Sequence, residues 1–320
     1  MSDVIGLVLP FFGLIFMGFV VARITRQPLE ALGWMTTFIV YVALPALFFQ
    51  LLAKTPFERL TEWGYIFGAV FSTFVIFAIM FTASFIKGRG EIAESTIKGL
   101  ASAYGNIGYM GPGLALLAFG EEAAVPVALI FCFENIMHFT LAPMMMALAG
   151  DEPRPPLSVA ADVVRKIVFH PFIIATAAGV LAAYFAFRAP VPVERFLEYL
   201  SRAAAPCALF AMGVTLALRP LKRVPHEMAP IALLKLIVHP LLCYVVLSWI
   251  GNFSPVWVFS AMLLAALPTA TNVFVIAQQY GVWVERASAS VLVTTCLSVL
   301  TVTGLLYLIQ HGILPPDLFP

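Results

Sequence analysis

The amino-acid sequence predicts an all-α integral membrane protein with ten transmembrane helices, arranged as five helices followed by a second, inverted set of five. Of the 320 residues, 62% are hydrophobic and 11% are charged, against about 25% charged residues in a typical soluble domain. Apolar runs long enough to cross a hydrocarbon core of about 30 Å recur along the chain. Two of these runs are interrupted by glycine, proline and asparagine.

The expected spans follow one another with short connections. They cover residues 4–23, 31–53, 62–86, 92–119, 123–148, 164–187, 195–218, 228–250, 255–281 and 283–310. Residues 1–148 form the first repeat, 149–163 a cytoplasmic linker rich in proline and charge, and 164–320 the second repeat. With both termini on the non-cytoplasmic side, the inner loops hold eleven lysines and arginines and the outer loops five, so the positive-inside rule favours that orientation.

Matching residues at one common offset indicate the repeat. A shift of 161 residues places Gly18 on Gly179, Pro45 on Pro206 and Phe49 on Phe210. Because each half has an odd number of spans, the second half enters the membrane in the opposite direction. Such inverted repeats are typical of secondary transporters.

The interrupted spans predict a binding site. YGNIGYMGPG occupies 104–113 and LPTATN occupies 267–272, although an interior glycine costs a helix about 1 kcal/mol and a proline about 3. Broken backbone is tolerated in a bilayer only where it is buried in protein or lines a polar cavity. We therefore expect the fourth and ninth spans to cross, with the amino-terminal ends of their half-helices around a bound anion.

Eight residues of these two segments are the candidate substrate-binding set. They are Asn106, Gly108, Gly111, Pro112, Pro268, Thr269, Thr271 and Asn272. Pro112 suits the first turn of a half-helix, and Thr269, Thr271 or Asn272 is expected to cap the other one. The alternative is a pair of proline kinks that serve packing alone, with glycines that allow helices to approach closely.

Ionisable residues at depth are candidates for coupling transport to an ion. Glu134 and His138 lie one helical turn apart, and an intramembrane carboxylate favours a transported proton. The alternative is a neutral glutamic acid bonded to His138 for packing. Lys98 and Lys235 are expected to snorkel to the inner interface, although Lys235 is also a candidate functional cation. Gln278 completes the coupling candidates, and the expected coupling ion is a proton or sodium.

Other function classes are disfavoured. Neither an HExxH zinc motif nor a GxSxG nucleophile elbow is present, so we expect no enzyme, no catalytic residue, no metal and no cofactor. The net charge is +1 and no basic stripe occurs, so no nucleic-acid partner is expected. The expected partners are a small organic anion and membrane lipid.

Four motifs together resemble the auxin efflux carrier family. They are ALPALFF (43–49), GNIGYMGPGLALLAFG (105–120), KLIVHP (235–240) and LPTATNVFVIAQQYG (267–281), and the resemblance covers essentially the whole chain, as a compact bacterial member. It implies a bile acid transporter-like fold with spans 1, 2, 6 and 7 as a scaffold and the remaining spans as a mobile transport domain. It also implies elevator-type alternating access, a homodimer formed through the scaffold, and Asn106, Pro112, Pro268 and Asn272 at the crossover. The glycine density around 104–113 departs from a plain proline crossover.

The expected function is secondary active transport of small organic anions, mono- or dicarboxylates such as malonate, malate or auxin-like acids, in the bacterial inner membrane. One alternative is a sodium-coupled carrier of a larger amphipathic anion such as a bile-acid-like compound. The other is an anion channel, because broken helices and polar residues at mid-membrane depth also occur in channels.

Overall fold

The described part of the chain is helical. The computed structural model describes residues 2–150, 161, 164–165, 168–218 and 225–319, so most of the expected linker 149–163 lies outside the described residues. Among these residues there is no β-strand, only an isolated backbone bridge between Gly105 and Thr269. Each of the ten apolar ranges predicted from the sequence contains helix.

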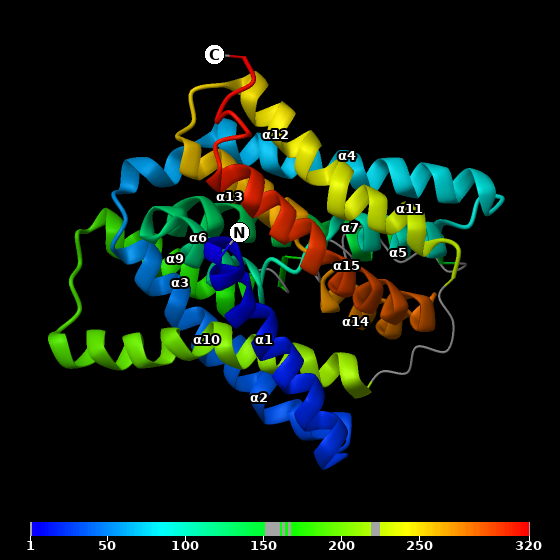
Figure 1. Ribbon diagram of the computed structural model, residues 1–320, viewed down its shortest axis with the longest axis horizontal. Helices are drawn as coiled ribbons and strands as arrows, with labels where there is room; N and C mark the ends of the chain where they lie inside the picture. The colour runs from blue at the N-terminus through cyan, green and yellow to red at the C-terminus, as the bar shows by residue number, and fades with distance from the viewer. Residues whose placement is uncertain (1, 151–160, 162–163, 166–167, 219–224, 320) are drawn as a thin grey trace. The chain divides into compact units, whose positions relative to one another are not determined.

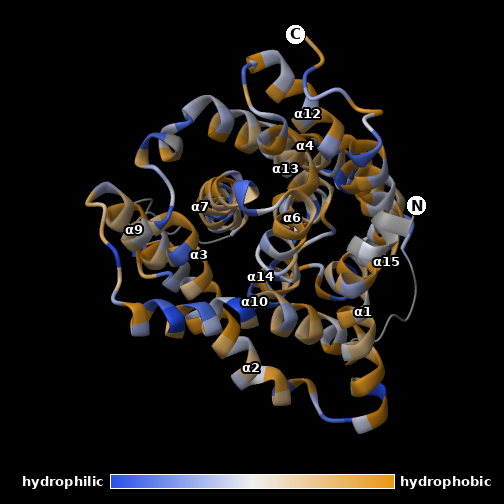
Figure 2. Cartoon of the chain, turned by 60° about the vertical axis from the view of Figure 1, so that its left-hand side comes forward, coloured by the Kyte–Doolittle hydropathy of each residue, from blue (hydrophilic) through white to orange (hydrophobic). Residues whose placement is uncertain are grey.

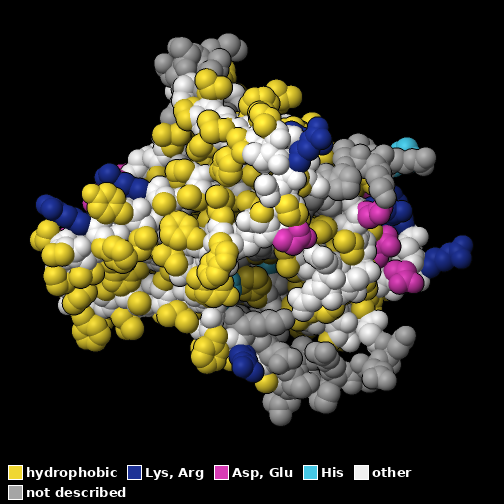
Figure 3. Space-filling view, turned by 90° about the horizontal axis from the view of Figure 1, so that it is seen from below, with side chains coloured by type: hydrophobic (Ala, Val, Ile, Leu, Met, Phe, Trp, Pro, Cys, Tyr) yellow, Lys and Arg dark blue, Asp and Glu magenta, His cyan; other side chains and the backbone are white. Residues whose placement is uncertain are grey.

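Within the residues that the structure describes, six helical segments are long and apolar enough to cross a membrane. They are Leu29–Ala53, Trp63–Lys87, Glu121–Ala149, Val191–Leu218, Met228–Ile250 and Val284–Gln310. Shorter apolar helices cover Leu9–Thr25, Ile173–Tyr184 and Pro255–Ala266. Hydrophobic residues predominate along the helices (Figure 2), and hydrophobic side chains gather on the left-hand part of the face drawn in Figure 3. The chain is therefore an integral membrane protein whose described part is all-helical.

The chain divides into two compact units, each made of three stretches. Unit 1 is Met1–Trp63, Gly108–Cys132 and Val168–Pro220, and unit 2 is Gly64–Ile107, Phe133–Ile167 and Leu221–Pro320. Each unit thus draws segments from both halves of the sequence.

Unit 1 contains α1 and its partners (Figure 1). Its helices are α1 (Ser2–Thr25), α2 (Gly33–Phe38), α3 (Leu44–Ala53), α6 (Gly111–Phe119), the first turns of α7 (Ala124–Ala149), α9 (Pro171–Tyr184) and α10 (Val191–Leu218). A 3-10 turn at Leu29–Leu32 precedes α2, and a π-helical turn at Ile39–Ala43 joins α2 to α3.

Glycines bring the helices of unit 1 into backbone contact. A side-chain carbon on Gly18 of α1 would overlap the carbonyl oxygen of Phe210 on α10. The equivalent carbon on Gly179 of α9 would lie 3.1 Å from the carbonyl oxygen of Phe49 on α3. Gly18 and Gly179 are 161 residues apart, and so are Phe49 and Phe210. The contact of Gly18 with Phe210 and the contact of Gly179 with Phe49 are therefore equivalent under the offset of 161 residues found in the sequence.

Unit 2 contains the remaining helices. They are α4 (Trp63–Lys87), α5 (Ile92–Ala103), the later turns of α7, α11 (Met228–Leu233), α12 (His239–Ile250), α13 (Pro255–Ala266), α14 (Thr271–Tyr280) and α15 (Val284–Gln310). The core of this unit includes Ile97, Leu100, Leu141, Val273 and Ala277, which come from α5, α7 and α14.

A wide helical turn separates α11 from α12. Residues Leu234–Val238 form a π-helix, and Pro240 follows as the second residue of α12. Proline has no N–H and its ring crowds the carbonyl one turn back, so a regular α-helix cannot continue through this point. Single π-turns occur frequently at functional sites, and this one carries Lys235.

Candidate functional site

Two broken helices meet through their backbones inside unit 2. α5 ends at Ala103 and α13 ends at Ala266, and the segments that follow pair as an antiparallel bridge. The Asn106 N–H donates to the Pro268 carbonyl at 2.7 Å, and the Ala270 N–H donates to the Tyr104 carbonyl at 2.9 Å. Backbone groups freed by each break are thereby satisfied by the other, as the apolar surroundings require.

Glycine at position 105 is what allows this approach. A side-chain carbon on Gly105 would lie 3.2 Å from the carbonyl oxygen of Leu264 and 3.3 Å from Nζ of Lys235. Both distances are tighter than ordinary carbon contacts, so a larger residue would require Leu264 or the Lys235 side chain to shift by a few tenths of an ångström. We refer below to the paired segments 104–107 and 267–270 as the bridge.

Threonine 269 anchors the bridge rather than capping a helix. Its hydroxyl donates to the Ala101 carbonyl at 2.7 Å, and its N–H donates to Oγ1 of Thr294 on α15 at 3.0 Å. The residue that precedes α14 is Ala270, and no side chain caps this helix. The expectation that Thr269, Thr271 or Asn272 caps α14 is therefore wrong, because Thr269 and Asn272 use their side chains elsewhere.

Tyrosine 104 links the bridge to two helices. Its hydroxyl donates to Oδ1 of Asn135 on α7 at 2.6 Å and accepts from Nδ2 of Asn272 on α14 at 2.8 Å. Its ring stacks on that of His138, with centroids 3.9 Å apart and planes 12° apart. Tyr104 was missed as a site residue. The signal was an aromatic hydroxyl next to a helix break, since a buried tyrosine hydroxyl requires a partner.

The structure places the eight candidate residues in both units. Asn106, Pro268 and Thr269 are buried in the bridge of unit 2, and Thr271 and Asn272 begin α14 with partly exposed side chains. Gly108, Gly111 and Pro112 belong to unit 1. Pro112 lies in the first turn of α6, which confirms its expected place in the second half-helix of that span.

Four polar side chains form a continuous buried chain near the bridge. Oγ1 of Thr73 donates to Oε1 of Glu134 at 2.6 Å and lies 3.0 Å from Nε2 of His239. Nδ1 of His239 lies 3.0 Å from Nζ of Lys235. Lys235 also donates to the carbonyl of Ala265 at 2.5 Å. This row of hydrogen-bonded groups thus runs from α7 through α4 and α12 to the last turn of α13.

Two expectations need correction: that Lys235 snorkels to the inner interface, and that Glu134 bonds to His138 for packing. Lys235 does not snorkel: it is 0% exposed, because His239 and Ala265 hold its ammonium group inside the unit. The Glu134 carboxylate does not bond to His138 either. Nδ1 of His138 meets the main-chain carbonyl of Glu134 at 2.6 Å, because the glutamate carboxylate is turned to Thr73.

Lys98 and Gln278 lie closer to the surface, whereas His138 is buried. Lys98 forms ion pairs with Glu94 at 2.6 Å and with Glu227 at 3.3 Å. These two carboxylates fix its ammonium group near the surface. Gln278 on α14 is exposed. Within the described residues, Nε2 of His138 is a buried polar atom with no hydrogen-bond partner.

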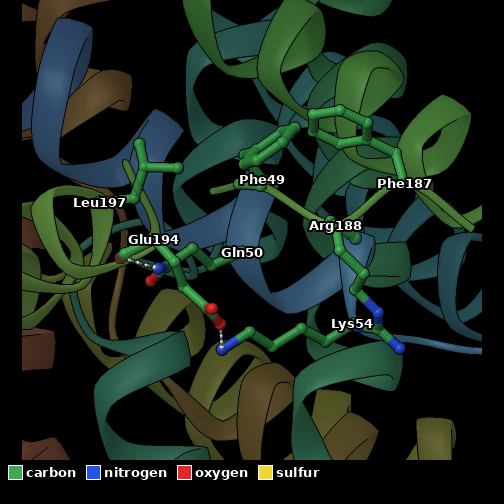
Figure 4. Close-up of a pocket in the computed structure, with 9 residues that line it drawn as sticks. Phe49, Gln50, Lys54, Phe187, Arg188, Glu194 and Leu197 are labelled. Carbon is green, nitrogen blue, oxygen red and sulfur yellow. Dashed lines mark hydrogen bonds and ion pairs between the residues drawn. The ribbon is translucent and has the colours of Figure 1, made fainter. Parts of the chain in front are cut away.

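Neither of two cavities away from the bridge suits a carboxylate. Figure 4 shows one in unit 1, between Lys54, Arg188 and Glu194, where Lys54 and Glu194 pair at 2.8 Å. Its volume of about 40 Å³ is far below the roughly 300 Å³ of a small-molecule site. The second, about 540 Å³, lies along α4 and is lined almost entirely by apolar residues such as Phe71, Phe74 and Ile79.

Comparison with known proteins identifies the family. Residues 3–306 match the model of the family described as "Membrane transport protein", which includes the auxin efflux carriers. The chain belongs to this family. It is therefore a membrane transporter and not an enzyme, and the resemblance found in its four motifs is confirmed.

Individual relatives match over most of the chain. The sequence is 62% identical over all 320 residues, and over 100% of both chains, to a protein of Rhizobium meliloti (strain 1021) named "Putative malonate transporter". It is 21% identical over 277 residues, 82% of this chain and 85% of the relative, to an uncharacterized transporter of Methanocaldococcus jannaschii.

Proposed function

We propose that this transporter is a secondary active carrier of small organic anions and that it binds their carboxylate at the bridge. The observation that carries the proposal is the pairing of two helix breaks, Gly105 with Thr269, beside buried amide side chains. Such irregular backbone at membrane depth is the pattern of substrate sites in transporters.

The start of α14 supports an anionic ligand. No side chain caps this ten-residue helix, so backbone N–H groups of its first turn are available to a ligand. The helix dipole adds partial positive charge at that end. Asn272 lies there, and its amide is held toward Tyr104. Backbone donors and amides recognise a carboxylate without a buried arginine.

The relative named as a malonate transporter makes malonate the first substrate to test. Its two carboxylates fit the proposed class of mono- and dicarboxylates. A larger amphipathic anion carried with sodium and an anion channel are the alternatives that the experiment below distinguishes.

We further propose ten membrane crossings in two inverted repeats of five. The exchange of the Gly18–Phe210 contact for the Gly179–Phe49 contact under one offset supports this repeat. Unit 1 contains the helices expected for the scaffold, α1, α3, α9 and α10 among them. In an elevator mechanism, unit 2 would carry the bound anion as the moving part.

The cellular arrangement also remains a proposal. We propose a homodimer formed through the scaffold helices, in the bacterial inner membrane, with both termini on the non-cytoplasmic side. The lysine and arginine distribution supports the orientation. Cysteine accessibility from either side of sealed vesicles, using a cysteine added at either terminus, tests it.

Substrate binding tests the site. Purified protein is heated in detergent with malonate, other dicarboxylates, monocarboxylates and bile-acid-like anions, each with and without sodium. A ligand at about 100 times its dissociation constant stabilises the folded state by about 2.7 kcal/mol, which a shift of the melting temperature reveals. Asn106→Ala and Asn272→Ala should each remove the shift. Gln279→Ala, which removes an exposed amide from the same helix as Asn272, is the matched control and should retain it.

Uptake into proteoliposomes then separates the function classes. Saturable uptake with counterflow identifies a carrier, whereas single-channel current identifies a channel. Wild-type affinity in both asparagine variants would contradict the site, and a shift only with bile-acid-like anions and sodium would favour the first alternative.

A further inference from the structure

We propose that Lys235, His239, Thr73 and Glu134 form a proton wire, through which the carrier moves a proton together with its carboxylate. This inference rests on the function proposed above, because it adds the coupling ion to the same carrier. It differs from the pair expected from the sequence, since the Glu134 carboxylate accepts from Thr73, whereas the His138 side chain meets only the Glu134 main-chain carbonyl.

The four groups are continuous and shielded. Successive contacts measure 3.0 Å from Lys235 to His239, 3.0 Å from His239 to Thr73 and 2.6 Å from Thr73 to Glu134. All four residues are at least 96% buried. An isolated buried charge is costly, and lysine and glutamate at depth are tolerated mainly where they pair or serve a pathway. The wire meets both conditions, because its members are hydrogen-bonded to one another and form a continuous path.

Every member of the wire can both donate and accept a proton, so the hydrogen bonds can reverse direction. In one arrangement the Lys235 ammonium donates to Nδ1 of His239, Nε2–H of His239 donates to Thr73, and the Thr73 hydroxyl donates to the Glu134 carboxylate. In the other, Nδ1–H of His239 donates to a neutral Lys235 amine and the protonated Glu134 donates to Thr73.

The conversion between the two arrangements is balanced. Nζ of Lys235 gives a proton to Nδ1 of His239, Nε2 of His239 gives its proton to Oγ1 of Thr73, and Thr73 gives its own to Oε1 of Glu134. Three N–H or O–H bonds break and three form, and the net charge of the wire stays at zero. The neutral Lys235 amine then takes a proton from water, which leaves the wire with one positive charge.

A neighbouring carbonyl accommodates that charged state. Oγ1 of Thr73 also lies 3.1 Å from the carbonyl of Ala69, one turn back on α4. When Glu134 is protonated and donates to Thr73, the Thr73 hydroxyl proton turns to Ala69. The His239 ring then turns over, so that its protonated nitrogen donates to Oγ1 of Thr73 and its unprotonated nitrogen accepts from the Lys235 ammonium. With this reset, no two protons in the wire face each other.

The titratable neighbours of the wire have other partners or lie outside the buried chain. Tyr65 on α4 donates to the Trp257 carbonyl at 3.0 Å, and His138 on α7 contacts the Glu134 carbonyl. The sequence of α13 contains no titratable residue. The other titratable side chains of the packed elements are Lys87 on α4, Cys132 on α7, Cys243 and Tyr244 on α12, Tyr104 in the bridge, Glu94 and Lys98 on α5, and Glu285, Arg286, Cys296 and Tyr307 on α15.

The wire ends at the proposed substrate site. Lys235 donates to Ala265, two residues before the bridge, and its Nζ limits the space beside Gly105. A positive charge gained by the wire therefore stands beside the bridge, where the carboxylate is proposed to bind. Opposite charges at short range favour each other, so the proton and the anion are expected to bind together and move in the same direction.

Thr73→Val tests the wire with the least disturbance, because it removes the hydroxyl and leaves both charged residues and the side-chain shape. Thr73→Ser retains a hydroxyl and is the matched control. Each protein is reconstituted into vesicles that contain a pH-sensitive dye, and malonate is added outside without a pH gradient. Labelled malonate counterflow is measured in parallel.

We expect wild type and Thr73→Ser to acidify the vesicle interior as malonate enters. Thr73→Val should lose this proton flux by roughly 10²-fold, the lower end of what a positioned proton-transfer group contributes, while malonate counterflow continues. Wild-type proton flux in Thr73→Val, or malonate entry into wild-type vesicles without acidification, would overturn the wire and leave the carrier function intact. Absence of any carboxylate transport by wild type would overturn both.

Infrared difference spectroscopy on the wild-type protein makes the test independent of variant folding. Adding malonate should increase the band of a protonated carboxylic acid, as Glu134 takes up the proton. If malonate binds and no such band appears, the wire is wrong.

Discussion

The two units bury polar side chains to very different extents. Of the twenty polar or charged residues buried in the described part of the chain, nineteen belong to unit 2 and one, Thr55, to unit 1. Unit 1 joins its helices by glycine contacts such as Gly18 with Phe210. Unit 2 joins its helices by side-chain hydrogen bonds, including those of Tyr104 and Thr73.

The difference indicates what each unit is built to do. Close backbone packing through small residues is how apolar helices associate in a membrane without polar groups. Buried polar groups contribute little net stability and are costly when a partner is lost. Their concentration in unit 2 therefore points to function there, whereas the contacts of unit 1 suit a rigid support.

The largest effect is expected from removing one end of the buried wire. Lys235→Met leaves Nδ1 of His239 and the carbonyl of Ala265 without their common donor, and each buried acceptor that loses its partner costs about 1–3 kcal/mol. Thermal unfolding in detergent measures the loss. Lys98→Met is the control, because Lys98 pairs near the surface and should cost about 1 kcal/mol or less.

A double variant shows whether the effect belongs to the pair. Lys235→Met with Glu134→Gln removes both charges, so it should be more stable than Lys235→Met alone, with a coupling energy of about 0.5–3 kcal/mol. Strictly additive losses would mean that the two charges do not interact through the chain.

The next effect tests the packing of unit 1. Gly18→Ala on α1 forces a methyl group against the Phe210 carbonyl, and overpacking of this kind costs about 1–3 kcal/mol. Gly13→Ala on the same helix meets no atom within 4 Å, so the same substitution should be neutral or stabilise by up to about 1 kcal/mol. Equal melting temperatures for the two variants would refute the glycine contact.

A smaller effect is expected at the bridge. Tyr104→Phe removes one hydroxyl, with its bonds to Asn135 and Asn272, and a hydrogen bond contributes about 0.5–1.5 kcal/mol of stability. The malonate-induced melting shift should fall further than the stability, since Asn272 loses the group that orients it. Tyr307→Phe is the control, because Tyr307 lies on α15 with its ring against His311. An unchanged malonate shift in Tyr104→Phe would remove Tyr104 from the site.

The sequence predicted the helices and the breaks because these depend on local composition. Apolar length defined the helical ranges; glycine and proline marked the first interruption, and proline and asparagine marked the second. These features need no knowledge of which helices become neighbours.

The wire of buried side chains could not be predicted in the same way. Thr73, Glu134 and His239 come from three helices far apart in the sequence, so only the packing of unit 2 brings them together. The pairing of Glu134 with His138 looked correct by spacing, but Thr73 competes for the carboxylate. The prediction that Asn272 caps α14 was wrong for a similar reason, because the Asn272 amide donates to the hydroxyl of Tyr104 instead.

The smallest expected effect tests whether burial, rather than polarity itself, separates the units. Arg286 in unit 2 pairs with Glu227 at 2.5 Å, and Arg202 in unit 1 pairs with Glu198 at 2.5 Å; both arginines are exposed. Exposed ion pairs contribute about 0.2–1 kcal/mol and weaken with salt. Arg286→Ala and Arg202→Ala should therefore cost the same small amount, and high salt should abolish both losses in thermal unfolding. A larger, salt-resistant loss for Arg286→Ala alone would show that unit 2 also depends on its surface charges, because Glu227 additionally holds Lys98 and Trp283.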